Sequence, residues 1–323
     1  MMKLTEEQLS TWKRDGIIVV PNVFTNEAVD AALEAVEKNA YDGLSYSEYR
    51  AKWNEKPDEL ENAYKNNNSL NQLAGPFGKI SHFPTGLEAV DTLIENENYT
   101  GIAKQILGTD EIRISYGQIF LREGLTDKRY SDHPWQGYHI DNGTNSAMPP
   151  HPDWQRYGYI LCSIMLHDID LDGAPMLICP GSQDQLDMIW EKHPGSAGGL
   201  GIPDLREFKE LAKPVPLIAK AGSAVYRSSY IVHAAQPFAN RSKQRVWMGY
   251  HFHRADNDDW CRTTRPIPRS SPHYMKFITN TTPTVRSVLG WPSLGDPYYT
   301  PEALARLAQA YPGIDLEPYK KSV

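Results

Sequence analysis

Cysteine is scarce in this chain of 323 residues, which has three, at Cys162, Cys179 and Cys261. The three are dispersed and form no Cys-x-x-Cys pair, so the sequence offers neither a disulfide framework nor a thiolate zinc site. Dispersed thiols are typical of proteins in a reducing compartment, and we therefore expect a cytoplasmic protein.

Long apolar runs and basic clusters are also missing from the sequence. No stretch approaches the roughly 18 apolar residues of a membrane span, and the first ten residues are polar and acidic, unlike a secretory signal. The formal net charge of −7 would repel a phosphate backbone, and no run of lysine or arginine offsets it. We expect a small-molecule substrate, no membrane and no nucleic acid as partners; the oligomeric state stays open.

Tyrosine, tryptophan and proline are plentiful instead, with 18, 8 and 24 residues. That mixture is typical of strand-rich proteins with long ordered loops. Apolar spacing and capping residues predict a mostly helical support over residues 1–108, with a short strand at 17–20 and a loop with a short helix over 41–80. Alternating patterns predict strands over much of 109–253, and a further helix is expected at 301–310. We expect a single domain over 1–323, with a barrel or sandwich of antiparallel strands, helices packed outside it, and residues 254–323 wrapped over the core.

The stretch Tyr138-His139-Ile140-Asp141 carries the first chemical signal. In an extended chain, side chains two positions apart share a face, so His139 and Asp141 can reach one point. One imidazole and one carboxylate are two thirds of a facial iron site, which needs a second imidazole and leaves positions open for substrate and oxygen. The pattern also occurs by chance, so its meaning depends on a second histidine.

His233 and Arg245 extend the pattern. Two strands are predicted around a tight bend, at residues 221–226 and 229–234, and His233 lies at the end of the second, which a barrel can return to the site. Arg245 begins the next predicted strand. A buried arginine that faces a cavity needs an anion, and its planar fork matches a carboxylate. Taken singly, His233 could be a core histidine and Arg245 a partner in a surface ion pair. Together with His139 and Asp141, they describe a site for a dicarboxylic 2-oxo acid.

Several segments in a consistent order carry a family resemblance: residues 4–8, 14–21, 139–141, 166–168, 173–176, 179–182, 222, 233–235, 240–242 and 245. Over roughly residues 4–252 the chain resembles the phytanoyl-CoA dioxygenase (PhyH) family of Fe(II)/2-oxoglutarate-dependent oxygenases. The resemblance implies a mainly β, α+β fold, in which N-terminal helices flank a double-stranded β-helix core, also described as a cupin-like jelly roll. It also implies three cofactors and co-substrates: Fe(II), 2-oxoglutarate and O2.

The resemblance assigns roles to particular residues. It makes His139, Asp141 and His233 the catalytic iron ligands and Arg245 the partner of the distant 2-oxoglutarate carboxylate. Further contacts to the co-substrate are expected from the following residues: Ser163, Gln118, Gln136 and Arg122.

The chain departs from the family pattern in three places. Gln183 replaces a frequent histidine, Ser163 replaces a usual aromatic residue, and the loop of residues 142–156 is long. Related halogenases replace the iron-binding carboxylate with a small residue, so the presence of Asp141 favours hydroxylation-type chemistry.

The implied reaction is oxidation, most simply hydroxylation, of a small organic substrate with release of succinate and CO2. A cupin-like metal enzyme that does not use 2-oxoglutarate and a non-catalytic barrel that only binds ligands are the alternatives. The substrate, the choice among hydroxylation, desaturation, cyclisation and epoxidation, and the roles of His133, His151, His251 and the 142–156 loop stay open.

Overall fold

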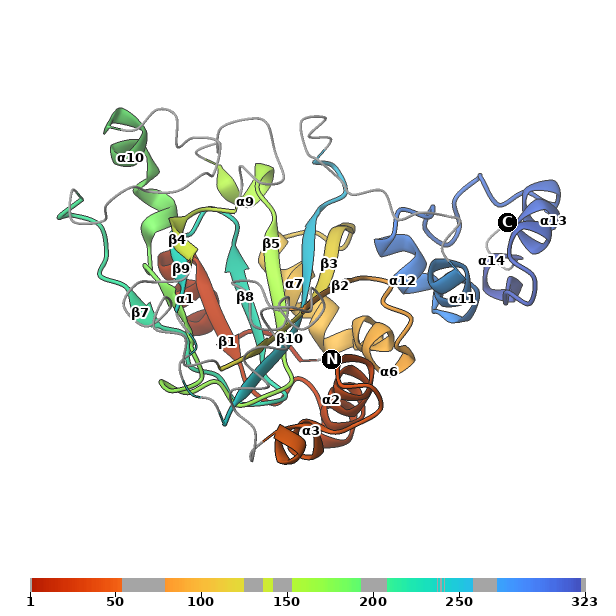
Figure 1. Cartoon of the computed structure of the whole chain (residues 1–323). Coiled ribbons are helices and arrows are strands. Elements are labelled where there is room, and N and C mark those ends of the chain that lie inside the picture. The colour runs from red at the N-terminus through yellow and green to blue at the C-terminus, as the bar shows by residue number, and fades with distance from the viewer. Residues whose placement is uncertain are drawn as a thin grey trace.

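Two antiparallel sheets pack face to face in the computed structural model, which describes residues 2–53, 79–124, 136–141, 153–192, 208–236, 238, 240, 242–257 and 272–320 (Figure 1). The larger sheet has the strand order β1 (Ile17–Val20), β8 (Ala224–Ser228), β5 (Ile160–Met165), β10 (Gln244–Arg254), β3 (Ile112–Glu123) and β2 (Lys79–His82). The smaller sheet has the order β4 (Gln136–His139), β9 (His233–Ala235), β6 (Met176–Ile178) and β7 (Val215–Pro216). This is the jelly-roll architecture expected from the sequence.

Helices from the N-terminal third cover the outer face of the larger sheet. They are α1 (Glu6–Asp15), α2 (Asn26–Ala40), α3 (Tyr46–Trp53), α6 (Glu88–Asp91), the 3₁₀ helix η1 (Thr92–Glu95) and α7 (Glu97–Leu107). Local sequence sets their ends. Thr5 and Gln8 form a capping box at the start of α1, and Gly16 and Gly108 end α1 and α7 with φ of 68° and 64°.

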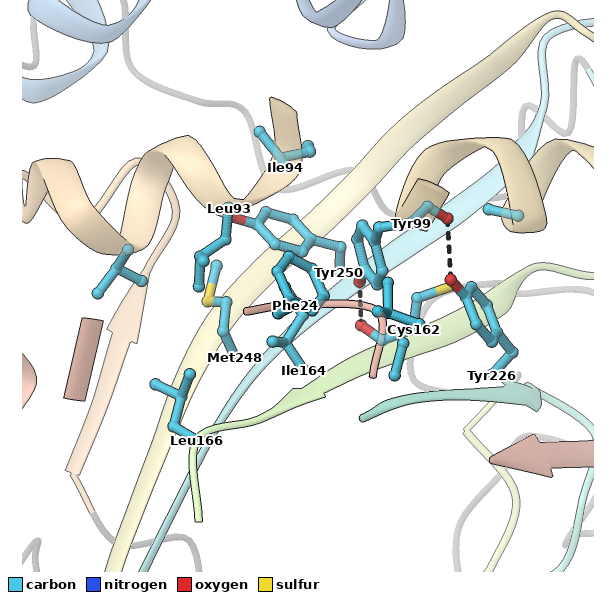
Figure 2. Packing of buried hydrophobic residues seen from close by; sticks show 14 of the residues in the cluster. Phe24, Leu93, Ile94, Tyr99, Cys162, Ile164, Leu166, Tyr226, Met248 and Tyr250 are labelled. Atoms are coloured by element: carbon cyan, nitrogen blue, oxygen red, sulfur yellow. Dashed lines mark hydrogen bonds between the residues drawn. The ribbon is translucent and has the colours of Figure 1, made fainter. Parts of the chain in front are cut away.

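Alternation along β10 divides the larger sheet into two different faces. Val246, Met248, Tyr250 and Phe252 point outward into the main hydrophobic core, while Arg245, Trp247, Gly249 and His251 have the opposite parity, as the sequence predicts. The core joins the sheet to the helices: Tyr99 of α7 donates a hydrogen bond from its hydroxyl to the Cys162 carbonyl of β5, and Tyr226 of β8 donates to the Tyr99 carbonyl at 2.9 Å (Figure 2).

Short helices lie on the connections and at the C-terminal end. The connections contain α9 (Trp154–Tyr157), η3 (Ser182–Asp184) and α10 (Leu186–Lys192). The C-terminal part forms α11 (Pro272–Asn280), α12 (Pro283–Val288), α13 (Pro301–Ala310) and α14 (Glu317–Lys320), which lie to one side of the sheets (Figure 1). The helix expected at residues 301–310 is thereby confirmed. Within the described residues, no helix is long and apolar enough to cross a membrane.

Two local predictions differ from the structure. Residues 79–82 form the edge strand β2, where a loop was expected up to residue 80, so the N-terminal support contributes β2 as well as the predicted strand at residues 17–20. His233, expected at the end of a strand, instead begins β9, because the bend after β8 falls at residues 229–232. A short edge strand without a clear alternating pattern gives little sequence signal.

The Tyr99 hydroxyl gives a test of how the helices hold the sheet. Tyr99 is 0% exposed, so Tyr99→Phe removes a buried hydrogen bond without changing the packing of the ring. We expect the free energy of unfolding to fall by about 1 kcal/mol, as measured by urea denaturation. Tyr298→Phe, at a side chain that is 52% exposed, should change it by less than about 0.5 kcal/mol. Equal effects of the two substitutions would contradict this role for Tyr99.

Candidate metal centre

His139 and His233 face each other across the β4–β9 strand pair. They are direct Cα partners in the antiparallel register, and their ring centroids lie 4.2 Å apart. Side chains directly opposite in such a pair lie on the same face and within contact distance. Strand pairing therefore brings together two imidazoles that are 94 residues apart in sequence (233 − 139).

Asp141 completes a compact group of three. It follows the end of β4, and its Oδ1 lies 3.6 Å from His139 Nε2 while its Oδ2 lies 3.5 Å from His233 Nε2. One potential ligand atom from each of the three side chains lies within 4.8 Å of the others. In the part of the chain that the structure describes, no other group of histidine, cysteine and acidic side chains is placed to hold a metal ion.

The outer nitrogens of the imidazoles are arranged for metal binding. His139 Nδ1 lies 2.8 Å from the Gly137 carbonyl, and His233 Nδ1 lies 3.0 Å from the Ile231 carbonyl. A carbonyl oxygen can only accept, so each Nδ1 donates a proton, and in the neutral imidazole the lone pair then lies on Nε2, toward Asp141. Protein metal sites commonly fix ligand histidines through such hydrogen bonds, so this donor set fits a divalent iron ion.

Charge in the site is balanced by Arg227, which the sequence analysis did not single out. Its Nη2 lies 2.8 Å from Asp141 Oδ2. Burial acts to raise the pKa of Asp141, but Arg227 and the two imidazoles outweigh it and hold that pKa well below its usual range. Burial, aided by Arg227, lowers the pKa of His233. Both groups are thus in the metal-binding protonation state at neutral pH.

Arg245 and Arg122 lie farther along the same inner face. They are Cα partners across β10 and β3 and are 3% and 4% exposed. Arg245 donates to the Ala174 carbonyl and stacks on Trp247, with 4.0 Å from its guanidinium carbon to the ring centroid; Arg122 donates to the Gln236 carbonyl at 3.1 Å. Within the described residues, neither guanidinium has a carboxylate in ion-pair range, and Arg245 Nε has no hydrogen-bond acceptor.

Burial lowers the pKa of both Arg122 and Arg245. It lowers the pKa of Arg122 to about 10, and burial followed by the nearby Arg122 charge lowers the pKa of Arg245. Two like charges opposite each other in a sheet are unfavourable without an anion between or beside them. The pair is therefore a place where an anionic ligand would be stabilised.

Three other residues were predicted to contact the co-substrate: Gln118, Ser163 and Gln136. Gln118 and Ser163 lie in the larger sheet, and Gln136 lies in the smaller sheet. Gln118 and Ser163 border Gly249 on the inner face: a Cβ built on Gly249 would lie 3.8 Å from Ser163 Oγ and 3.9 Å from the Gln118 carbonyl, which is ordinary van der Waals contact. The Gln118 side chain accepts a hydrogen bond from Tyr116. Gln136 lies at the start of β4 opposite Ala235, with its side chain outside the described set.

His251 lies on the inner face at the metal end of β10. Its ring stacks on Tyr159 at 5.3 Å and meets Tyr116 edge-on at 5.1 Å. Tyr159 in turn donates its hydroxyl to the Asp141 carbonyl at 2.7 Å. His251 therefore belongs to an aromatic wall beside the metal group. His133, His151 and residues 142–152 of the long loop lie outside the described residues.

Gln183, which replaces a histidine that is frequent in the family, has its side chain directed toward the end of α1. The Gln183 side chain donates to the carbonyls of Lys13 and Arg14 at 3.4 and 3.2 Å, at the end of α1. A Cβ on Gly16 would lie 2.4 Å from its Oε1 atom. Gln183 therefore closes the contact between η3 and α1, and its difference from the family pattern does not alter the metal group.

A jelly roll with two imidazoles and one carboxylate on facing strands has the architecture and donor set of non-haem iron oxygenases. The chain belongs to the phytanoyl-CoA dioxygenase (PhyH) family, whose model matches residues 12–246. This membership confirms the expected class, an Fe(II)- and 2-oxoglutarate-dependent dioxygenase that uses O2, and with it the double-stranded β-helix fold.

Individual relatives are distant. The chain is 22% identical to an ectoine dioxygenase of Bordetella bronchiseptica over 243 residues, 72% of this chain and 70% of the relative. It is 24% identical to an ectoine dioxygenase of Stutzerimonas stutzeri over 72% of this chain and 71% of the relative. The structure of EctD from S. alaskensis with 2-oxoglutarate and 5-hydroxyectoine matches with a TM-score of 0.54 and 16% identity, covering 82% of each chain. At this identity the structural likeness supports the fold alone.

Proposed function

We propose that His139, Asp141 and His233 bind Fe(II) in a facial arrangement. The observation that carries this proposal is the orientation of the two imidazoles. Each donates from Nδ1 to a backbone carbonyl, at 2.8 and 3.0 Å, and so directs a lone pair on Nε2 toward the shared carboxylate. Three protein ligands on one side leave the remaining iron positions for small ligands.

We propose further that Arg245, assisted by Arg122, binds the distant carboxylate of 2-oxoglutarate. Both guanidiniums are buried, and within the described residues both lack a counter-ion. A dicarboxylate that reaches from the metal group to this pair would supply the missing charge, and an arginine fork binds a carboxylate with two parallel hydrogen bonds. Gly249 and the small Ser163 lie along the way.

Fe(II) held by these residues would supply the oxidative chemistry, in which 2-oxoglutarate and O2 give succinate and CO2 while one oxygen atom goes to a substrate carbon. The protein itself holds the metal and the co-substrate and sets their orientation. The hydrophobic contacts of Trp247, Val225 and Met165 close one end of the interior, while Tyr159, His251 and Tyr116 wall the metal end. Exclusion of water from such an interior strengthens the charge interactions that orient the co-substrate.

The substrate we propose is a free, small polar molecule, and the outcome is hydroxylation. Three features support it: the acidic balance of the chain, which disfavours a coenzyme A phosphate group, the polar and aromatic wall at the metal end, and the naming of curated relatives as ectoine dioxygenases. A cupin-like enzyme without 2-oxoglutarate would leave the buried pair of Arg245 and Arg122 without an anion.

Succinate release from 2-oxoglutarate tests the whole proposal. The purified protein is incubated with Fe(II), 2-oxoglutarate and O2, with and without each compound of a panel of small polar metabolites that includes ectoine. The expected result is substrate-stimulated succinate formation and a product one oxygen atom heavier. Metal-dependent turnover without succinate would identify the cupin-like alternative, and metal binding with no O2 uptake for any compound would favour the non-catalytic barrel.

Substitution of the carboxylate tests the metal assignment. Asp141→Ala should weaken Mn(II) binding, measured by anaerobic calorimetry, by more than about 100-fold and abolish turnover, because one of three ligands is lost. His139→Ala should do the same. Asp110→Ala, at an exposed residue of the turn before β3, is the matched control and should bind as the parent does. Normal metal affinity in Asp141→Ala would refute the assignment.

Removal of the distant cation tests the co-substrate assignment. Arg245→Met should raise the dissociation constant for 2-oxoglutarate, on the metal-loaded protein, about 10- to 100-fold, since a charge-assisted bond pair is lost. Metal affinity should stay unchanged, and Arg122→Met should show a smaller effect of the same kind. Arg254→Met serves as control, because this arginine of the same strand pairs with Asp256 at the surface. An unchanged 2-oxoglutarate affinity in Arg245→Met would exclude this role.

A further inference from the structure

Arg227 is a buried cation that contacts two of the three candidate iron ligands. It lies on β8, is 6% exposed, and places Nη2 at 2.8 Å from Asp141 Oδ2 and Nη1 at 3.3 Å from His233 Nδ1. We propose that Arg227 is a positioning residue: it holds the Asp141 carboxylate so that one oxygen binds the metal and the open metal positions remain for the co-substrate. This inference rests on the function proposed above.

Arg227 contacts both Asp141 and His233, but its guanidinium positions the carboxylate of Asp141 and does not donate to His233. His233 Nδ1 cannot both donate to the Ile231 carbonyl and accept from Arg227, because it has either a proton or a lone pair. The carbonyl contact is the shorter, at 3.0 Å against 3.3 Å, and His139 makes the same kind of contact. The proton therefore lies on His233 Nδ1, and the guanidinium acts on the carboxylate.

The contact selects one oxygen of Asp141. Each oxygen lies near one imidazole, Oδ1 at 3.6 Å from His139 Nε2 and Oδ2 at 3.5 Å from His233 Nε2, but the guanidinium of Arg227 approaches Oδ2, at 2.8 Å. A carboxylate that bound the metal through both oxygens would occupy a position that a chelating 2-oxo acid or O2 needs. A guanidinium on Oδ2 favours coordination through Oδ1 alone.

The backbone of Asp141 is fixed without Arg227. Its N–H donates to the Ser229 carbonyl at 3.0 Å, and its carbonyl accepts from the Tyr159 hydroxyl at 2.7 Å. Loss of Arg227 would therefore leave the residue in place and release only the carboxylate. The expected defect is a change in how the metal is coordinated, with the three ligands still present.

Charge adds to the geometric effect. Arg227 and Asp141 together are neutral, so a divalent metal with two neutral imidazoles carries a net charge of about +2, which the dianion of 2-oxoglutarate matches. Without Arg227 the same assembly would be negative once the co-substrate is bound. The orientation of the Asp141 carboxylate and the charge of Arg227 therefore both favour tighter binding of 2-oxoglutarate.

Anaerobic binding measurements on the full chain test the proposal. In Arg227→Met, Mn(II) should still bind, whereas the dissociation constant of 2-oxoglutarate on the metal-loaded protein should rise about 10- to 100-fold. The visible charge-transfer absorption of Fe(II) with chelated 2-oxoglutarate should weaken or shift. The matched control is Arg113→Met on β3, whose guanidinium donates to the Ile112 carbonyl and, among the described residues, has no contact with the candidate iron ligands; it should behave as the parent does.

The outcomes separate this inference from the proposed function. If the parent protein binds neither metal nor 2-oxoglutarate, the proposed function fails. If the parent binds both and Arg227→Met binds 2-oxoglutarate within about twofold of it, only the positioning role fails. If Arg227→Met does not fold, Arg227→Lys decides, since it keeps the charge but loses the planar fork. Weaker 2-oxoglutarate binding in a folded Arg227→Lys supports the role, and parental binding overturns it.

Discussion

The pairing of β4 with β9 is the constraint on which the site depends. It sets His139 directly opposite His233, and a slip of one residue would turn one imidazole to the other face of the sheet. The smaller sheet contributes only short strands, so its register is supported from elsewhere. The Cys179 N–H bonds to the Val232 carbonyl at 2.9 Å, and the Val232 N–H bonds to Ser182 Oγ at 2.8 Å. These contacts hold the chain in register just before His233.

The larger sheet has opposite physical requirements on its two faces. Its outer face is apolar and packs on helices, and burial of Tyr226, Met248 and Phe252 stabilises the fold whether or not a ligand is bound. Its inner face carries buried cations, each of which is costly without a partner. Arg227 has Asp141, whereas Arg245 and Arg122 have no carboxylate among the described residues. The outer face of these strands thus stabilises the fold, whereas their inner face carries the cations proposed to bind the ligand.

Much of this arrangement could be predicted from the sequence because local rules govern it. Capping at Thr5 and Gly16, and alternation from Arg245 to His251, depend on neighbours in the chain. Arg227 could not be predicted in the same way. The strand was expected to end at Tyr226, whereas β8 continues to Ser228, and only the facing sheet gives the charge a partner. The sequence did offer one indication: Val225 and Arg227 are two positions apart, so in a strand both side chains lie on the same, inward face.

Arg227 and Asp141 also link the metal group to the stability of the interior. Each charge is buried, and removal of one residue deprives the other of its closest opposite charge, a change that costs several kcal/mol. The two residues therefore depend on each other: in the proposed site, a small residue at 141 would leave a cation beside the metal, and an apolar residue at 227 would leave the carboxylate without its arginine. In the proposed site, a chain that contains both residues therefore keeps a carboxylate at position 141, whereas an iron site open to an exogenous anion needs a small residue there.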